Sequence, residues 1–294
     1  MGKHVFGGDW TQEKLLRLEK YLKAYTRIFK SNPQAQFFTI TYMDAFAGTG
    51  SREAPEGKKT ADTAMLFDLD DADARNFQRG SANIALTTEP GFDHYIFIEA
   101  NRPFAEELEK LKSKFREKSI RVESRDANSY LQEWCRKTDW GRNRAVVFLD
   151  PYGMEVEWPT MEAIASTKAI DVWILFPLGQ AVNRLLTKKQ EPPKPWAERL
   201  TKFFGTEDWK DEFYRTSRQL SLLGGAEDVE RDASFDSISQ FFLNRLDEIF
   251  EGVSRHPLWL SNSKDIPIYL LCFAAANPKG AKTAIRIAND ILLR

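Results

Sequence analysis

Cysteine and histidine are scarce in this chain, and that scarcity argues against several kinds of site. The sequence holds two cysteines, Cys135 and Cys272, and neither lies in a Cys-x-x-Cys pattern. Two cysteines build no disulfide framework, and they are typical of a reducing cytoplasm, where we expect this protein. The three histidines, His4, His94 and His256, stand far apart without metal-ligand spacing. We therefore expect neither a metal site nor a thiolate nucleophile.

Long hydrophobic runs and a dominant charge are also lacking. The longest apolar runs, such as Ala145–Leu149 and Val172–Leu178, are much shorter than the roughly 20 residues of a membrane-spanning helix. Met1–Trp10 has no apolar core followed by a cleavage site, so we expect no signal peptide and no membrane. Lys and Arg number 42 against 43 Asp and Glu, which excludes a uniformly basic coat for nucleic acid but leaves local basic faces open.

What the sequence does contain is an alternation of strand-like and helix-like segments. Leucines and aromatics recur every three to four residues over Thr11–Lys30, which predicts an amphipathic helix. Near-continuous apolar runs, typical of parallel strands buried on both faces, follow at Phe37–Met43, Tyr95–Glu99, Ile120–Glu123, Ala145–Leu149 and Val172–Phe176. Helical spacing appears between them at Pro103–Lys118, Ala127–Lys137 and Thr160–Thr167. This alternation predicts a doubly wound α/β fold with helices on both faces of the sheet.

The last segments predict an antiparallel far edge and a closing helix. Pro257–Leu260 and Ile268–Ala275 are separated by a turn-like stretch, and helical spacing follows over Gly280–Leu293. Two other segments, 51–79 and 184–252, fit the alternation of strands and helices poorly and are interpreted as insertions. We therefore expect a single domain over residues 1–294, composed of an N-terminal helical element (1–36), a central α/β core (37–183) with an insertion (51–79), a helical insertion (184–252), and C-terminal strands and a helix (253–294).

A glycine-rich turn follows the first predicted strand. Glycines at a strand's carboxyl end let the backbone approach a ligand closely, and open α/β sheets bind ligands beyond those ends. The pattern predicts a site for a nucleotide-like cofactor, although a tight turn without a ligand is the alternative. Neither the dinucleotide fingerprint nor a phosphate-binding loop fits. The candidate cofactor residues here are Asp44, Phe46, Ala47, Gly48, Thr49 and Gly50.

Acidic residues end the next two strands. Glu99 follows the second strand, where a carboxylate can accept hydrogen bonds from ribose hydroxyls. Asp126 and Ala127 follow the third strand. Asp126 could accept from an adenine amino group or could cap the following helix, and both can hold at once.

The fourth strand ends in Asp150-Pro151-Tyr152-Gly153. This tetrapeptide resembles the Asp/Asn-Pro-Pro-Tyr/Phe box of amino-group methyltransferases, which implies that Asp150 and the backbone beside Pro151 accept hydrogens from a target nitrogen. Tyr152 stands where the box has its second proline and Gly153 where it has its aromatic residue, so the stacking geometry differs. A structural turn is the alternative interpretation.

Together these motifs resemble the core of a class I S-adenosylmethionine-dependent methyltransferase, a Rossmann-like sheet that is mostly parallel with an antiparallel far edge. Nearly the whole chain is similar to the three-Cys-motif partner protein (TcmP) family, in Phe6–Thr11, Tyr42–Gly50, Phe148–Met154, Val156–Trp158, Leu175–Gly179, Val182–Leu185, Tyr269–Ala274 and Asn277–Gly280. The resemblance implies S-adenosylmethionine as cofactor and a companion protein with three cysteines, of a radical-SAM-like kind.

Further polar and aromatic residues are candidates for the substrate side. Trp10 could cover the cofactor or pack on the first helix, and Pro177, Asn183 and Arg184 follow the fifth strand. Lys279 stands at the start of the last helix, where it could hold a phosphate or remain solvated.

Three functions remain open from the sequence. The first is an S-adenosylmethionine-dependent methyltransferase acting on an exocyclic amino group of a nucleic-acid base, with Asp150, Pro151 and Tyr152 as catalytic residues. The second is a non-catalytic partner protein that keeps the methyltransferase fold. The third is a small-molecule methyltransferase.

Overall fold

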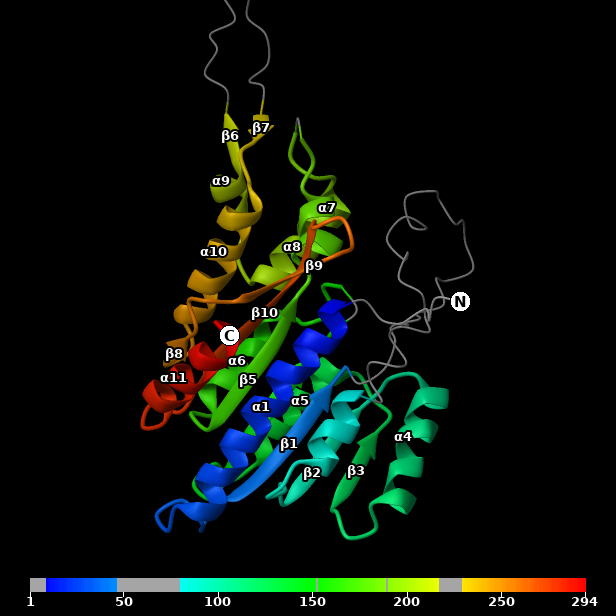
Figure 1. Cartoon of the computed structure of the whole chain (residues 1–294). Helices are drawn as coiled ribbons and strands as arrows, with labels where there is room; N and C mark the ends of the chain where they lie inside the picture. The colour runs from blue at the N-terminus through cyan, green and yellow to red at the C-terminus, as the bar shows by residue number, and fades with distance from the viewer. Residues whose placement is uncertain (1–8, 47–79, 152, 189, 217–228) are drawn as a thin grey trace, which may run out of the picture.

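The computed structural model describes residues 9–46, 80–151, 153–188, 190–216 and 229–294. Within these ranges, eight strands form one sheet in the order β3-β2-β1-β4-β5-β10-β8, with β9 also paired to β10 (Figure 1). The parallel strands are β1 (Thr39–Ala45), β2 (His94–Ile98), β3 (Ile120–Glu123), β4 (Asn143–Leu149) and β5 (Ile170–Phe176). The antiparallel edge consists of β8 (Gly252–Val253), β9 (Leu258–Ser261) and β10 (Pro267–Ala275). The predicted Rossmann-like α/β fold is confirmed.

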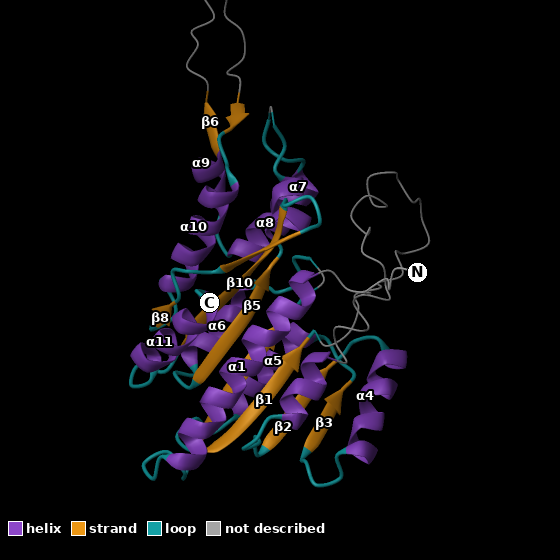
Figure 2. Ribbon diagram, viewed as in Figure 1, coloured by secondary structure: helices purple, strands orange, loops and turns teal. Residues whose placement is uncertain are grey.

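Helices cover both faces of this sheet (Figure 2). One face carries α1 (Asp9–Ser31), a helix at residues 80–87, α4 (Arg102–Lys114) and α11 (Ala281–Leu292). The other face carries α5 (Ala127–Lys137), α6 (Trp158–Ser166) and α10 (Phe235–Asp247). This two-sided cover explains why the strands read as continuous apolar runs, since alternate residues of each strand face different helices.

The alternation is clearest in the central strands. Phe148 of β4 and Trp173 of β5 belong to the core beneath α1, whereas Val147 and Ile174 belong to the core beneath α5 and α6. All seven residues of β5 are buried. The middle of the sheet is therefore held by apolar packing on both sides.

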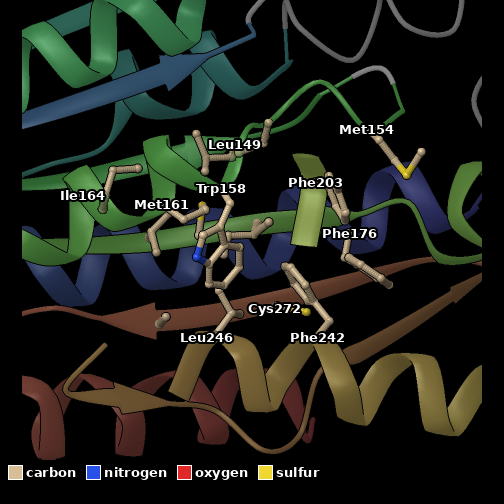
Figure 3. Packing of buried hydrophobic residues seen from close by; sticks show 14 of the residues in the cluster. Leu149, Met154, Trp158, Met161, Ile164, Phe176, Phe203, Phe242, Leu246 and Cys272 are labelled. Atoms are coloured by element: carbon tan, nitrogen blue, oxygen red, sulfur yellow. The ribbon is translucent and has the colours of Figure 1, made fainter. Parts of the chain in front are cut away.

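The segment predicted as a helical insertion packs on the α5 and α6 face. The π-helix η1 (Leu178–Val182) lies just before it, and its helical elements are α7 (Asn183–Leu185, which begins one residue before the predicted bound), α8 (Lys194–Phe204), α9 (Trp209–Phe213) and α10. It also contains a ribbon of β6 (Tyr214–Thr216) and β7 (Val229–Arg231), which the sequence analysis did not predict. Phe176 of β5 stacks on Phe242 of α10, with ring centroids 4.2 Å apart and Phe203 of α8 beside them (Figure 3). The segment thus contributes to the same hydrophobic core as the sheet.

Candidate active site

The carboxyl ends of the parallel strands form one edge of the sheet, and strand order reverses there between β1 and β4. The chain moves outward from β1 through β2 to β3, then returns to β4 on the other side of β1. Helices after β1 and β4 therefore leave on opposite faces, and open α/β sheets bind their ligands at such a switch point. Register pairs Ala45 of β1 with Leu149 of β4, so Phe46 and Asp150, the next residue of each strand, lie at this switch point.

Asp44 lies near the end of β1 at this switch point and is buried. Its carboxylate accepts hydrogen bonds from Ser81 Oγ at 2.7 Å and from the Tyr42 hydroxyl at 3.3 Å. Burial raises the pKa of Asp44 to about 7, against the lowering effect of the Ser81 hydrogen bond. Phe46 turns the backbone with a left-handed φ of 66°, unusual for a bulky residue. The predicted residues Ala47, Gly48, Thr49 and Gly50 lie outside the described residues.

Glu99 follows β2 and is 2% exposed. The backbone amide of Asn101 donates to Glu99 Oε1, whereas Oε2 is buried without a hydrogen-bond partner among the described residues. The pKa of Glu99 is raised to about 7, mainly by burial and to a smaller degree by the negative charges of Glu155 and Asp44, against the lowering effect of the hydrogen bond from Asn101. A buried carboxylate oxygen without a hydrogen-bond partner lowers the stability of the folded protein. At this edge of the sheet, the same oxygen can accept a hydrogen bond from a ligand hydroxyl.

Asp126 acts as a helix cap in this structure. It precedes α5, and its Oδ1 accepts from the backbone amide and the hydroxyl of Ser129, at 2.9 and 2.8 Å. The side chain is exposed, and Ala127 behind it is buried. The capping interpretation is thus confirmed, while contact with an adenine amino group stays a prediction.

Asp150, which follows β4, forms a buried ion pair that the sequence analysis missed. Lys14 Nζ on α1 lies 3.1 Å from Oδ1 and 3.1 Å from Oδ2 of Asp150. The two side chains are 2% and 12% exposed. Burial raises the pKa of Asp150, and the charge of Lys14 opposes that rise; burial lowers the pKa of Lys14, and Asp150 opposes that fall. Pro151 is buried, and Tyr152 lies outside the described residues.

A sequence signal for Lys14 was present in the first helix. α1 runs opposite to the parallel strands, so its first turns lie at the edge toward which the β1 and β5 arrows point (Figure 1). Lys14 sits one turn after Trp10 and one turn before Leu18, on the same side of the helix. A lysine within a stripe of apolar residues indicates a buried charge that needs a partner, and this pattern could have identified Lys14.

Trp10 is the candidate substrate-side residue nearest this pair. Its ring lies 5.1 Å from Lys14 Nζ and 5.4 Å from the ring of Tyr269. Trp10 therefore packs against neighbouring side chains, as one of its two interpretations predicts. It also lies next to Lys14, the ion-pair partner of Asp150.

The residues that follow β5 surround the π-helix η1. Pro177 precedes η1, and Arg184 in the next turn is exposed. The side-chain oxygen of Asn183 accepts a hydrogen bond from Arg231, which also donates to the backbone oxygens of Asn183 and Leu186. Asn183 therefore joins α7 to the β6–β7 ribbon, and a part in substrate contact stays a prediction.

Lys279 does not lie with the other candidates. β10 runs antiparallel to β5, so Leu270 pairs with Phe176 at the carboxyl end and Ala275 pairs with Asp171 at the amino end. The chain consequently leaves β10 at the opposite edge of the sheet, where the exposed Lys279 precedes α11. The prediction that Lys279 belongs to the substrate side is corrected by this strand direction.

Burial makes both cysteines poor nucleophiles. Cys135 and Cys272 are both buried, and burial raises the pKa of Cys135 to about 12 and that of Cys272 further. Across the part of the chain that the structure describes, His, Cys, Asp and Glu form no group of three that could hold a metal ion. Over the same residues, no helix is both long enough and apolar enough to cross a bilayer.

Comparisons with known proteins concern the fold. No family model matches the chain, and no curated protein matches it. Among solved structures, the chain is similar to protein LPL1258 from Legionella pneumophila str. Philadelphia 1, of family model DUF519, with a TM-score of 0.50 and 14% identity over 98% of this chain and 92% of that one. It also matches a proposed methyltransferase, yhhF from Escherichia coli, with a TM-score of 0.27 and 12% identity over 72% and 86%. The first likeness covers nearly the whole length of both chains and concerns the fold alone, whereas the resemblance to the TcmP family stays a prediction.

Proposed function

We propose that this protein is an S-adenosylmethionine-dependent methyltransferase acting on an exocyclic amino group of a nucleic-acid base. The observation that carries the proposal is the arrangement of Asp44, Glu99 and Asp150 at the ends of three parallel strands around the switch point. The fold's ligands bind at this edge, and buried acids with raised pKa values are typical of functional sites.

The residues present fit the cofactor. Glu99 Oε2 is buried and without a partner among the described residues, which suits hydrogen bonds from the ribose hydroxyls. Asp44 lies beside it at the end of β1, where a carboxylate would suit the positive charge of the cofactor. When bound, S-adenosylmethionine would supply a methyl group: the carbon–sulfur bond breaks, a carbon–nitrogen bond forms, and the acceptor nitrogen releases a proton to solvent.

In the proposed reaction, Asp150 binds the amino group that accepts the methyl group. Its carboxylate follows β4, adjacent to β1 in the sheet, and can accept a hydrogen bond from an amino group held at the switch point. Such a bond orients the nitrogen, and orientation is the main contribution that a protein makes to direct transfer. The family resemblance adds a three-cysteine radical-SAM-like companion as a proposed partner and nucleic acid as a proposed substrate.

Cofactor binding is the first test. Titration calorimetry with S-adenosylmethionine should show binding to the full chain, and Glu99→Gln should weaken it roughly tenfold or more, since one hydrogen bond to a charged group is worth about 1.5–3 kcal/mol. Glu109→Gln is the matched control, because Glu109 is an exposed glutamate on α4. Absence of binding to the wild-type chain would contradict the enzyme and leave a non-catalytic partner protein.

Methyl transfer is the second test. Cells lacking the gene supply RNA, DNA and a small-molecule extract, and each is incubated with methyl-labelled S-adenosylmethionine, with and without the companion. We expect label in a nucleic-acid fraction, on a base nitrogen, and little label with Asp150→Asn. Label in the small-molecule extract alone would favour the small-molecule methyltransferase.

A further inference from the structure

The ion pair between Lys14 and Asp150 joins the N-terminal helix to the end of β4. The two residues are 136 positions apart, and both oxygens of Asp150 lie 3.1 Å from the same nitrogen. Lys14 is 1% exposed. This side chain is therefore held inside the molecule at the candidate acceptor position, with Asp150 as its charge partner.

Stability is a weak reason to keep such a pair. Removing two charges from water costs several kcal/mol per ion, and well-packed apolar residues of similar volume often serve as well or better. The neighbouring residues of the same stripe, Trp10 and Leu18, are apolar. A charge is thus placed where an apolar side chain would complete the core, which points to a role in the site.

The geometry leaves Asp150 able to bind a second partner. A carboxylate has about four lone-pair positions, and a nitrogen equidistant from both oxygens uses one on each. The remaining positions can accept from an amino group. Lys14 therefore orients the carboxylate while leaving acceptor capacity.

We propose that Lys14 is a positioning residue that keeps Asp150 ionised and admits only neutral amino groups beside it. The inference rests on the proposed methyl-transfer function. The charged and titratable groups around Asp150 are Lys14 from α1 and Asp44 and Tyr42 from β1. Among the residues that the structure describes around Asp150, Lys14 is the one that carries a positive charge, and it opposes both the burial of Asp150 and the negative charge of Asp44.

The same charge defines the class of acceptor. An aliphatic amine is an ammonium ion near neutral pH, because its pKa is roughly 10, and Lys14 repels it. An exocyclic amino group of a base is neutral and still donates N–H hydrogen bonds to a carboxylate. Asp150 can therefore accept from the base amine, while the lysine beside it disfavours protonated amines.

The first experiment measures the charge of Asp150 directly. In protein labelled with carbon-13 at the aspartate carboxyl carbon, the Asp150 resonance is assigned as the one lost in Asp150→Asn. Lys14→Met should raise its titration midpoint by about 1–3 pH units, the usual effect of one close opposite charge. Lys14→Arg should keep the wild-type midpoint. An unchanged midpoint in Lys14→Met would overturn the proposal, whether or not the protein transfers methyl groups.

Adding a small amine to a variant that lacks the lysine side chain tests whether the site selects neutral amines. In Lys14→Ala, added propylammonium should occupy the vacated place and return the Asp150 midpoint toward the wild-type value. The same compound should leave the Asp150 resonance of the wild-type protein unshifted, and a shift there would contradict the exclusion of ammonium groups. Circular dichroism and urea unfolding confirm that each variant is folded.

The second experiment uses the nucleic-acid fraction that accepts label from the wild-type protein. Lys14→Met should lower kcat at pH 7 at least tenfold, with partial recovery at higher pH as Asp150 ionises, while KM for S-adenosylmethionine stays unchanged. A purely structural role would lower activity equally at every pH, and that result would refute the inference. If the wild-type protein binds no S-adenosylmethionine, the proposed function fails and the resonance measurement still decides on the ion pair.

Discussion

Asp171 provides a measurable prediction at the edge of the sheet opposite the candidate site. It is the second residue of β5, it is 8% exposed, and it accepts a hydrogen bond from the Tyr21 hydroxyl at 2.7 Å. Burial raises the pKa of Asp171 to about 7, and this effect exceeds the lowering by the Tyr21 hydrogen bond and the positive charge of Arg144. The perturbation is Asp171→Asn, which keeps an oxygen acceptor for Tyr21 and removes the titration.

The sign and size of the effect follow from linkage. The folded-state pKa of Asp171 is about 7, whereas an unfolded aspartate has a pKa near 3.9, so folding favours the protonated form. The contribution to stability is therefore largest below about pH 4 and is lost progressively as pH rises to about 7. Three pKa units correspond to about 4 kcal/mol. The substitution should have little effect at pH 4 and should stabilise the protein by up to this amount at pH 8.

Urea unfolding of both proteins between pH 4 and pH 8 is the assay. The difference in free energy of unfolding is plotted against pH, so that all other titrating groups cancel. Asp290→Asn on the exposed side of α11 is the control and should give a flat difference. A flat difference for Asp171→Asn would refute the assignment of a buried, destabilising charge. Affinity for S-adenosylmethionine should be unchanged, because Asp171 lies at the other end of the strands.

Three further predictions concern single residues. Asp126→Ala removes the cap of α5 and should cost about 1 kcal/mol in urea unfolding, with a smaller loss for Asp126→Ser. Gly179→Ala would bring a methyl carbon to 2.1 Å from the backbone oxygen of Pro267, so Tm should fall by several degrees, whereas Gly141→Ala, whose methyl carbon would meet the side-chain oxygen of Asp139 at 3.0 Å in an exposed turn, should lower it less. Affinity for S-adenosylmethionine should rise between pH 6 and pH 8, because Glu99, with a pKa of about 7, accepts best when ionised; in Glu99→Gln this rise should be smaller, and the part that is left comes from Asp44, whose pKa is also about 7.

The parallel strands could be predicted from the sequence because burial on both faces demands apolar residues throughout. The predicted strand Ile120–Glu123 has the observed bounds. Other strands begin earlier than predicted, at Asn143 and Ile170, because pairing with the neighbouring strand continues past the apolar run. Hydrogen-bond register is a property of two strands, and hydrophobicity in one segment does not report it.

The β6–β7 ribbon and the π-helix η1 could not be predicted for a related reason. Each ribbon strand has three residues, too few for a periodic pattern, and the pairing depends on a partner more than ten residues away. η1 depends on Gly179 lying against the backbone of β10, a contact made only in the folded chain.

In the candidate site, the acids could be predicted and their surroundings could not. Glu99 and Asp150 stand directly after apolar strands, so the rule for strand ends located them. Asp126 was ambiguous because the same residue type serves a cap and a ligand. Lys14 was missed because its partner is distant in sequence, and helical spacing alone does not say which buried polar residue it will meet.

The two edges of the sheet show why the acids at the carboxyl end suggest function. At the amino end, Asp171 is a buried acid hydrogen-bonded to Tyr21, an arrangement that packing alone can maintain. At the carboxyl end, Asp44, Glu99 and Asp150 gather around the switch point, and burial raises the pKa of each. Lys14 offsets part of this negative charge. Asp150 is balanced by Lys14, whereas the negative charge of Asp44 and Glu99 is unfavourable in the free protein and would become favourable beside a positively charged ligand such as the sulfonium of S-adenosylmethionine.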